Sequence, residues 1–219
     1  MSIQHRVAAV CPNCGKVTES KIRGTVNIGL NPELREGVLT GRIRRATCPF
    51  CSSEFNVEWL FLYHDPTRQF IISYHPIIKD GRTAPIPTET LDVSEKVLCN
   101  YNLRLVTSWN HLREKIGIFE DGLDDYPIET IKSVIGGKIF GTPKFGDEAL
   151  FYLCTRQSSS GESELVFQAF HGREHLADAR FPLDMYRTVQ QEVIKKFGRG
   201  WERGEWMTIN QGGIGRGKR

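Results

Sequence analysis

Four cysteines occur in two identical C-P-x-C motifs, a spacing that is typical of metal ligands. The motifs are Cys11-Pro12-Asn13-Cys14 and Cys48-Pro49-Phe50-Cys51. Each tight turn places two thiolates on one side, and proline at the second position pre-sets that turn without removing a needed donor. Four thiolates form the closed tetrahedral site of structural zinc. The spacing therefore predicts one structural Zn²⁺ ion held by Cys11, Cys14, Cys48 and Cys51.

Disulfides, redox chemistry and an iron–sulfur centre are alternative uses of the same four cysteines. Neither motif opens a helix within a βαβ unit, which disfavours a thioredoxin-like reaction. Two separate redox pairs also require a more complicated account than one shared ion. Ser52-Ser53 follows the second motif where Gly15 follows the first. We therefore expect the backbone that follows the second motif to be strained or to form a different turn.

A closed four-sulfur site leaves no coordination position for water, so it does not activate a nucleophile. The sequence also contains no nucleophile–base motif and no phosphate-binding glycine loop. These features predict a non-enzymatic module that presents a rigid, zinc-fixed surface to a protein partner. The less favoured hypothesis is an enzyme with a non-zinc site at His64, Asp65 or His75, which are more simply interpreted as polar residues at turns.

Three further groups of residues have ordinary structural interpretations. His171 and His175 have the i, i+4 spacing of a metal pair, but Gly172 and strand-like flanks argue against the helix it requires. Acidic residues at 120–125 favour helix capping and a solvated corner over a docking patch. Cys99 and Cys154 follow apolar residues and are expected to be small buried side chains.

The 219-residue chain carries a net charge of +3, and its basic excess lies near the C-terminus. Residues 195–219 contain seven basic and two acidic residues, with many glycines and with Trp201 and Trp206. Because such segments can contact phosphates and stack on bases, the alternative function is nucleic-acid binding through this tail. The chain has no apolar run of membrane-spanning length and no signal-peptide pattern, which predicts a cytoplasmic protein without a membrane partner.

Hydrophobic periodicity predicts the secondary structure. Short apolar runs and alternation of apolar with polar residues indicate strands at residues 7–10 and 22–28, a hairpin over 55–63 and 69–74, and a strand at 102–106. Asn31-Pro32 opens a short helix that ends by Gly41. Asn110 is expected to cap one helix and Asp124 or Asp125 a second. After residue 148 we expect strands at 149–156, 164–170 and 175–181 and a helix capped by Asp184. Residues 79–90 are expected to form a loop.

The fold class expected is α+β, in two parts. Residues 1–137 form a zinc ribbon elaborated by an inserted strand and helix, a β-hairpin and a helical pair. Glycines at 136–137 and Gly141-Thr142-Pro143 mark a linker. Residues 138–198 form a small αβ domain, and residues 199–219 a loosely ordered tail that docks elsewhere. Short connections favour antiparallel pairing.

The sequence resembles the CpXC family, a prokaryotic domain named for its paired cysteine motifs. The resemblance lies in C-P-N-C-G, N-P-E-L-R-E-G-V-L-T-G, C-P-F-C and the L-Y-H-D run, followed by R-L-V-T-S-W-N-H-L-R-E-K-I-G-I-F-E-D-G-L-D-D. It covers about residues 5 to 135. The resemblance implies a bacterial or archaeal source and metal ligation by the same four cysteines. It implies no particular reaction or substrate.

Overall fold

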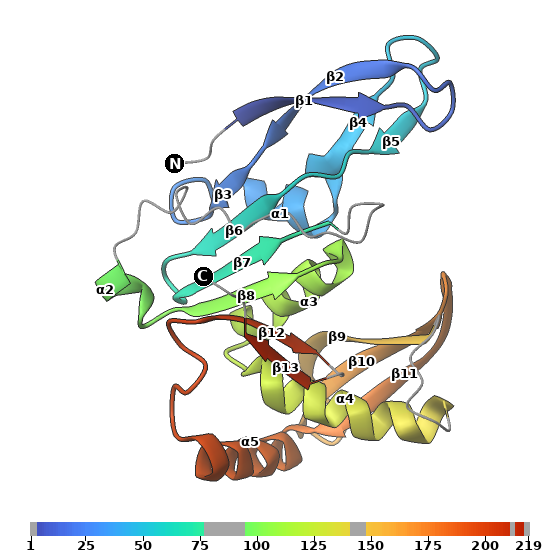
Figure 1. Cartoon of the computed structure of the whole chain (residues 1–219). Coiled ribbons are helices and arrows are strands. Elements are labelled where there is room, and N and C mark those ends of the chain that lie inside the picture. The colour runs from blue at the N-terminus through green and yellow to red at the C-terminus, as the bar shows by residue number, and fades with distance from the viewer. Residues whose placement is uncertain (1–3, 77–94, 141–147, 211–212, 217–219) are drawn as a thin grey trace. The chain divides into compact units, whose positions relative to one another are not determined.

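The computed structural model describes residues 4–76, 95–140, 148–210 and 213–216, which form five α-helices and several β-sheets (Figure 1). Contacts divide the chain into a first unit, residues 1–113, and a second unit, residues 114–218. The division falls inside α3 (Trp109–Glu120). The structure confirms the α+β class. The predicted loop at 79–90 lies outside the described residues.

Two β-hairpins of the first unit carry the cysteine motifs. β1 (Gln4–Val10) pairs antiparallel with β2 (Val17–Arg23), and β4 (Arg45–Thr47) pairs antiparallel with β5 (Glu54–Asn56). Each motif forms the turn of its own hairpin. The two turns lie side by side at one end of the unit (Figure 1). The sequence prediction of two cysteine turns meeting at one point is thus confirmed in outline, while the zinc-ribbon classification stays a prediction.

A mixed sheet forms the centre of the first unit, with strand order β3-β6-β7-β8. The strands are β3 (Thr25–Asn27), β6 (Phe61–Asp65), β7 (Phe70–Tyr74) and β8 (Asn102–Val106). The predicted hairpin is present in part, because β6 and β7 pair antiparallel across the turn after Asp65. The single strand expected over 55–63 is instead β5 and β6, with residues 57–60 in neither strand. However, β3 pairs with β6 and β7 pairs with β8 in parallel. The expected antiparallel pairing holds for strands joined by short turns but not for these two pairs, because long connections separate the partners in sequence.

An aromatic cluster packs on this sheet and fixes the helices against it. The ring centre of Trp109, at the start of α3, lies 5.1 Å from the ring centre of Phe61 and 5.3 Å from that of Tyr74. Its Nε1 donates to the carbonyl of Val38 in α1 (Leu34–Leu39) at 3.1 Å. A 3₁₀ turn (Arg42–Arg44) and α2 (Glu95–Leu98) complete the helical segments of this unit. Aromatic packing thus joins α1 and α3 to the sheet.

The caps of α3 and α4 differ in part from the prediction. Ser108, rather than Asn110, caps α3, because its Oγ accepts from the N–H of His111 at 3.2 Å. Gly122, with φ of 71°, follows the end of the helix. The following helix α4 (Asp125–Phe140) then runs through Gly136 and Gly137. These two glycines therefore lie inside a helix and do not begin a linker.

The second unit packs α4 and α5 (Leu183–Phe197) against a three-stranded antiparallel sheet. β10 (Ser163–His171) is the central strand, between β9 (Glu148–Gln157) and β11 (Glu174–Pro182). The β10 side chains of Leu165, Phe167 and Ala169 are fully buried. The three strands and α5 agree with the prediction, whereas α4, which was expected to belong to the first domain, packs against the same sheet.

The C-terminal segment is more ordered than the sequence suggested. β12 (Trp206–Asn210) and β13 (Gly213–Arg216) form an antiparallel hairpin, and β12 packs against α4. Trp206, Met207 and Ile209 are buried. The expectation that this segment docks elsewhere in the protein is therefore met. The expectation that it is loosely ordered was wrong for residues 206–210, because apolar residues within the glycine-rich segment form a buried strand.

Candidate metal centre

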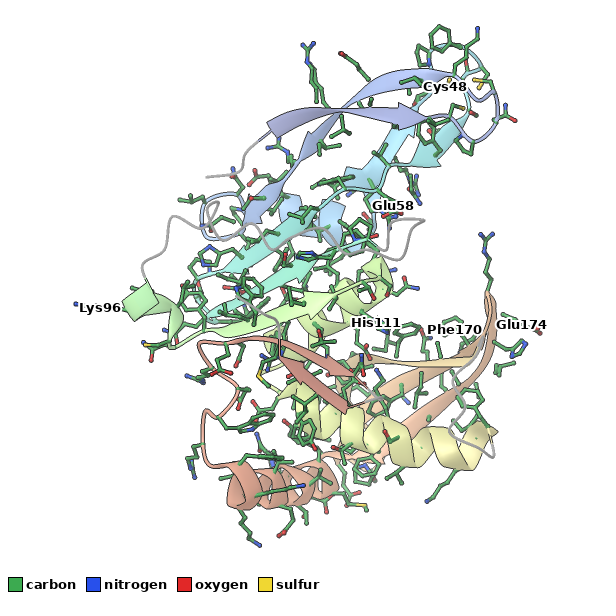
Figure 2. All side chains as sticks on the ribbon, in the orientation of Figure 1. Cys48, Glu58, Lys96, His111, Phe170 and Glu174 are labelled. Atoms are coloured by element: carbon green, nitrogen blue, oxygen red, sulfur yellow. The ribbon has the colours of Figure 1, made fainter. Side chains whose placement is uncertain are left out.

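The four predicted ligands converge on one point. The Sγ atoms of Cys11, Cys14, Cys48 and Cys51 all lie within 4.8 Å of one another, at the tips of the two hairpins (Figure 2). Cys11 Sγ is 3.7 Å from Cys51 Sγ, and Cys14 Sγ is 3.6 Å from Cys48 Sγ. Zinc–sulfur bonds of about 2.3 Å in a tetrahedron separate the sulfurs by about 3.8 Å. The cluster can therefore hold one metal ion.

All six cysteines are free thiols, which argues against the disulfide alternative. The shortest sulfur–sulfur distance in the cluster, 3.6 Å, is far longer than the covalent bond of about 2.05 Å. Cys99 is exposed and Cys154 is half-buried, so neither is the fully buried side chain that the sequence suggested.

The two motifs have the same backbone hydrogen bonds. In the first, Gly15 N donates to the Cys11 carbonyl at 2.9 Å and Cys11 N donates to the carbonyl of Lys16 at 3.0 Å. In the second, Ser52 N donates to the Cys48 carbonyl and Cys48 N donates to the carbonyl of Ser53, both at 2.9 Å. Gly15 has φ of 70° and Ser52 has φ of 60°. Ser52 therefore adopts the left-handed conformation, which is unfavourable for a residue with a side chain. The sequence allowed either a strained backbone after the second motif or a different turn, and the strained backbone is the one observed.

Ser53 and Asn13 surround the sulfurs and were not identified from the sequence as site residues. Ser53 Oγ lies 3.1 Å from Cys51 Sγ and 3.3 Å from Cys11 Sγ. The side-chain amide of Asn13 donates to Cys51 Sγ at 3.6 Å. Their positions in the sequence could have identified them, because polar residues within or just after a metal-binding motif commonly hydrogen-bond to the metal ligands.

These neighbours favour the ionised form of some of the thiols. Hydrogen bonds from the Ser53 hydroxyl and backbone N–H, with the Asn13 amide, lower the pKa of Cys51 to about 5. The Ser53 hydroxyl and the N–H of Cys14 likewise lower the pKa of Cys11. Although the N–H of Lys16 favours its thiolate, desolvation and the Cys48 sulfur raise the pKa of Cys14 to about 11. A bound cation favours the thiolate form of all its ligands.

The histidines considered for a non-zinc site have separate structural partners. The side-chain amide of Asn27 lies 3.2 Å from His64 Nδ1, and burial lowers the pKa of His64. Asp65 is fully buried and accepts from the N–H groups of Thr67 and Arg68, as a turn residue does. His75 Nε2 lies 2.8 Å from Ser73 Oγ. These contacts fit the interpretation as turn and core residues.

The other two candidate groups also have structural contacts. His171 and His175 lie on the paired strands β10 and β11, and His175 Nε2 bonds to Asp178 Oδ1 at 2.8 Å. Within residues 4–76, 95–140, 148–210 and 213–216, the four cysteines are the one group of His, Cys, Asp or Glu side chains that could hold a metal ion. Asp121 accepts from the Thr155 N–H at 2.9 Å, and Asp125 is buried against Lys115. The acidic segment is therefore partly a buried structural element.

Comparison with known proteins establishes the family. The CpXC family model, described as CpXC protein, matches residues 9–132, more than half of the chain. The chain therefore belongs to the CpXC family. No curated protein and no solved structure matches it. In the described part of the chain, no helix is both long and apolar enough to cross a membrane.

Proposed function

We propose that this protein is a non-enzymatic module whose four cysteines bind one structural Zn²⁺ ion and so hold a rigid surface for a protein partner. The supporting observation is the convergence of four sulfurs within 4.8 Å of one another, from two hairpins distant in sequence. In small cysteine-rich domains, zinc binding contributes on the order of 10 kcal/mol to folding. Such a site would hold the two hairpins together. Each hairpin is a sheet of only two strands, which is marginally stable by itself.

The donor set favours zinc among divalent ions. Four thiolates in a tetrahedron suit zinc and iron, whereas magnesium and calcium require oxygen ligands. A four-thiolate site has no open position, so its contribution is structural rather than catalytic. The cysteines of this chain would hold the ion, and Ser53 and Asn13 would orient and stabilise the thiolates.

Exposed apolar side chains surround the proposed metal centre and define the hairpin tip surface. Val10 and Val17 are directly opposite each other on β1 and β2 and are 63% and 61% exposed. Phe50, inside the second motif, is 57% exposed. The ammonium of Lys16 lies 4.6 Å from the centre of the Phe50 ring. Exposed apolar groups gathered at a rigid tip are typical of an interaction site.

The charge around the hairpin tip surface favours an acidic partner. Residues 6–23 and 42–56 contain seven basic and two acidic residues. Lys16, Lys21 and Arg45 are exposed. A tetrathiolate zinc centre subtracts about two charges and still leaves the region positive. We therefore expect the partner to be a protein segment that combines apolar and acidic side chains.

Nucleic-acid binding through residues 195–219 has less support. Trp206 is buried in β12, and Trp201 stacks on Phe197 with ring centres 4.6 Å apart. The two aromatic side chains on which that hypothesis depended are therefore engaged within the second unit, which leaves less surface for base stacking.

Site-specific photocrosslinking in the native host tests the proposed partner surface. A benzoylphenylalanine at position 50 is expected to crosslink to an acidic, apolar protein segment. The same label at Leu153, an exposed apolar position in the second unit, serves as the control. Charge reversal by Lys16→Glu with Lys21→Glu should reduce the yield severalfold. Identical products from positions 50 and 153, or a yield insensitive to charge reversal, would count against the surface.

A further inference from the structure

A cavity of about 450 Å³ lies in the second unit, between the start of α4, the last turns of α5 and the loop at residues 198–203. The cysteine site belongs to the first unit, so the cavity is separate from it. Sites for small molecules commonly have volumes of roughly 300 to 1,000 Å³. The side chains that line the cavity therefore indicate what kind of ligand it would accept.

Two glycines shape the loop that follows α5. Gly198 has φ of 86° and Gly200 has φ of 67°, values that residues with a side chain rarely adopt. The N–H of Arg203 donates to the carbonyl of Gly200 at 3.1 Å, which closes a turn. The loop thereby brings Arg199, Trp201 and Arg203 to the wall of the cavity.

Aromatic packing holds this loop against the start of α4. The ring centre of Trp201 lies 4.6 Å from that of Phe197, in a stacked arrangement, and 5.5 Å from that of Tyr126, edge to face. The rings of Phe197 and Tyr126 are themselves in contact, with centres 5.7 Å apart. Tyr126 and Trp201 line the cavity together with the aliphatic side chains of Val193 and Ile194. The cavity therefore has an apolar wall on which the hydrocarbon part of a ligand would pack.

Two arginines bring positive charge to the wall of the cavity. Both are exposed, and in the part of the chain that the structure describes, the side chains of Arg199 and Arg203 form neither a hydrogen bond nor an ion pair. A guanidinium group is planar, and its N–H donors match the oxygens of a carboxylate or phosphate in pairs. The two side chains are therefore available to bind an anionic group.

Three carboxyl groups also line the cavity, but each already has an interaction. Asp125 Oδ2 lies 3.0 Å from Lys115 Nζ. Asp124 Oδ2 accepts from the side-chain amide of Gln190 at 2.5 Å. Glu202 likewise takes part in an interaction with another group. The two guanidinium groups are therefore the charged groups of the cavity with which a ligand would pair.

We propose that this cavity binds a small organic anion, whose carboxylate or phosphate group pairs with Arg199 and Arg203 and whose apolar body packs beside Trp201. Pairing with the guanidinium groups supplies charge-assisted hydrogen bonds, and the apolar wall adds burial of hydrocarbon surface. A cavity of this volume accommodates a single small ligand, whereas a nucleic-acid strand is bound along a groove that follows its backbone. The ligand is therefore a small molecule rather than a polymer.

Fluorine NMR of the full-length protein labelled with fluorotryptophan tests the proposal. The chain has four tryptophans, and Trp201→Phe identifies the signal of Trp201. Phenyl phosphate or benzoate should shift this signal in a saturable way, while the signals of Trp59 and Trp109 in the first unit stay unchanged. The tighter of the two probes identifies the anionic group. Inorganic phosphate and benzyl alcohol, which each lack one half of the proposed ligand, should bind at least about tenfold more weakly.

Two double variants separate the cavity from general surface charge. Arg199→Gln with Arg203→Gln should weaken binding of the tighter probe by at least about tenfold. Arg173→Gln with Arg187→Gln, at exposed arginines of the same unit outside the cavity, should bind like the wild type. Equal affinities of the two double variants would overturn the proposal. So would the absence of a saturable Trp201 shift with both probes in the wild type, or a shift produced by a single-stranded oligonucleotide but by neither probe.

Discussion

Ser53 shows how a single side chain can support the proposed metal centre. Its Oγ contacts two of the four sulfurs, and residues that hydrogen-bond to metal ligands commonly change affinity by 10- to 100-fold when mutated. We expect Ser53→Ala to weaken zinc binding by roughly tenfold in a competition titration with a chromophoric chelator. Ser159→Ala, at an exposed turn of the second unit, should bind zinc like the wild type. Equal zinc affinities of the two variants would show that Ser53 does not support the metal site.

Gly15 tests the conformation of the first cysteine turn. Its φ is 70°, and no atom lies within 4 Å of an added Cβ, so Gly15→Ala introduces backbone strain without a clash. We expect a loss of about 1 kcal/mol in the unfolding free energy. Gly37→Ala, inside α1 and equally uncrowded, should instead stabilise by about 0.5 kcal/mol. Chemical denaturation measures both, and two changes of the same sign would contradict the turn geometry.

At the scale of elements, β12 is a structural strand of the second unit. Ile209 is 2% exposed, and its antiparallel partner Ile214 on β13 is 37% exposed. Ile209→Ala should destabilise the unit by about 3 kcal/mol, through lost burial and a residual cavity. Ile214→Ala should cost less than about 1 kcal/mol. Thermal unfolding compares the two, and equally small effects would indicate that the segment contributes nothing to the fold.

Sequence reasoning located those elements whose determinants are local. The apolar runs at 60–63 and 69–74 predicted β6 and β7, and the repeated motif identified the four cysteines that converge. Parallel pairing of β7 with β8 was missed because it depends on a long connection rather than on a turn. The burial of Lys115 and Lys132 was missed because charged residues on helices are usually exposed to solvent.

At the scale of the whole molecule, the two units should respond differently to metal removal. The proposed ion belongs to the first unit, and the core of the second unit contains the buried side chains of β10. Treatment with a chelator should reduce hydrogen-exchange protection in residues 4–23 and 45–56 while residues 163–171 keep theirs. Equal loss of protection in both units would show that metal binding and folding are coupled along the entire chain.

Native mass spectrometry of the reduced, full-length protein tests the central claim most directly. We expect one zinc ion per chain, which is lost from Cys11→Ser with Cys48→Ser and retained by Cys99→Ser with Cys154→Ser. A folded chain purified without any metal, or one that holds iron or carries disulfides between the four cysteines, would contradict the account.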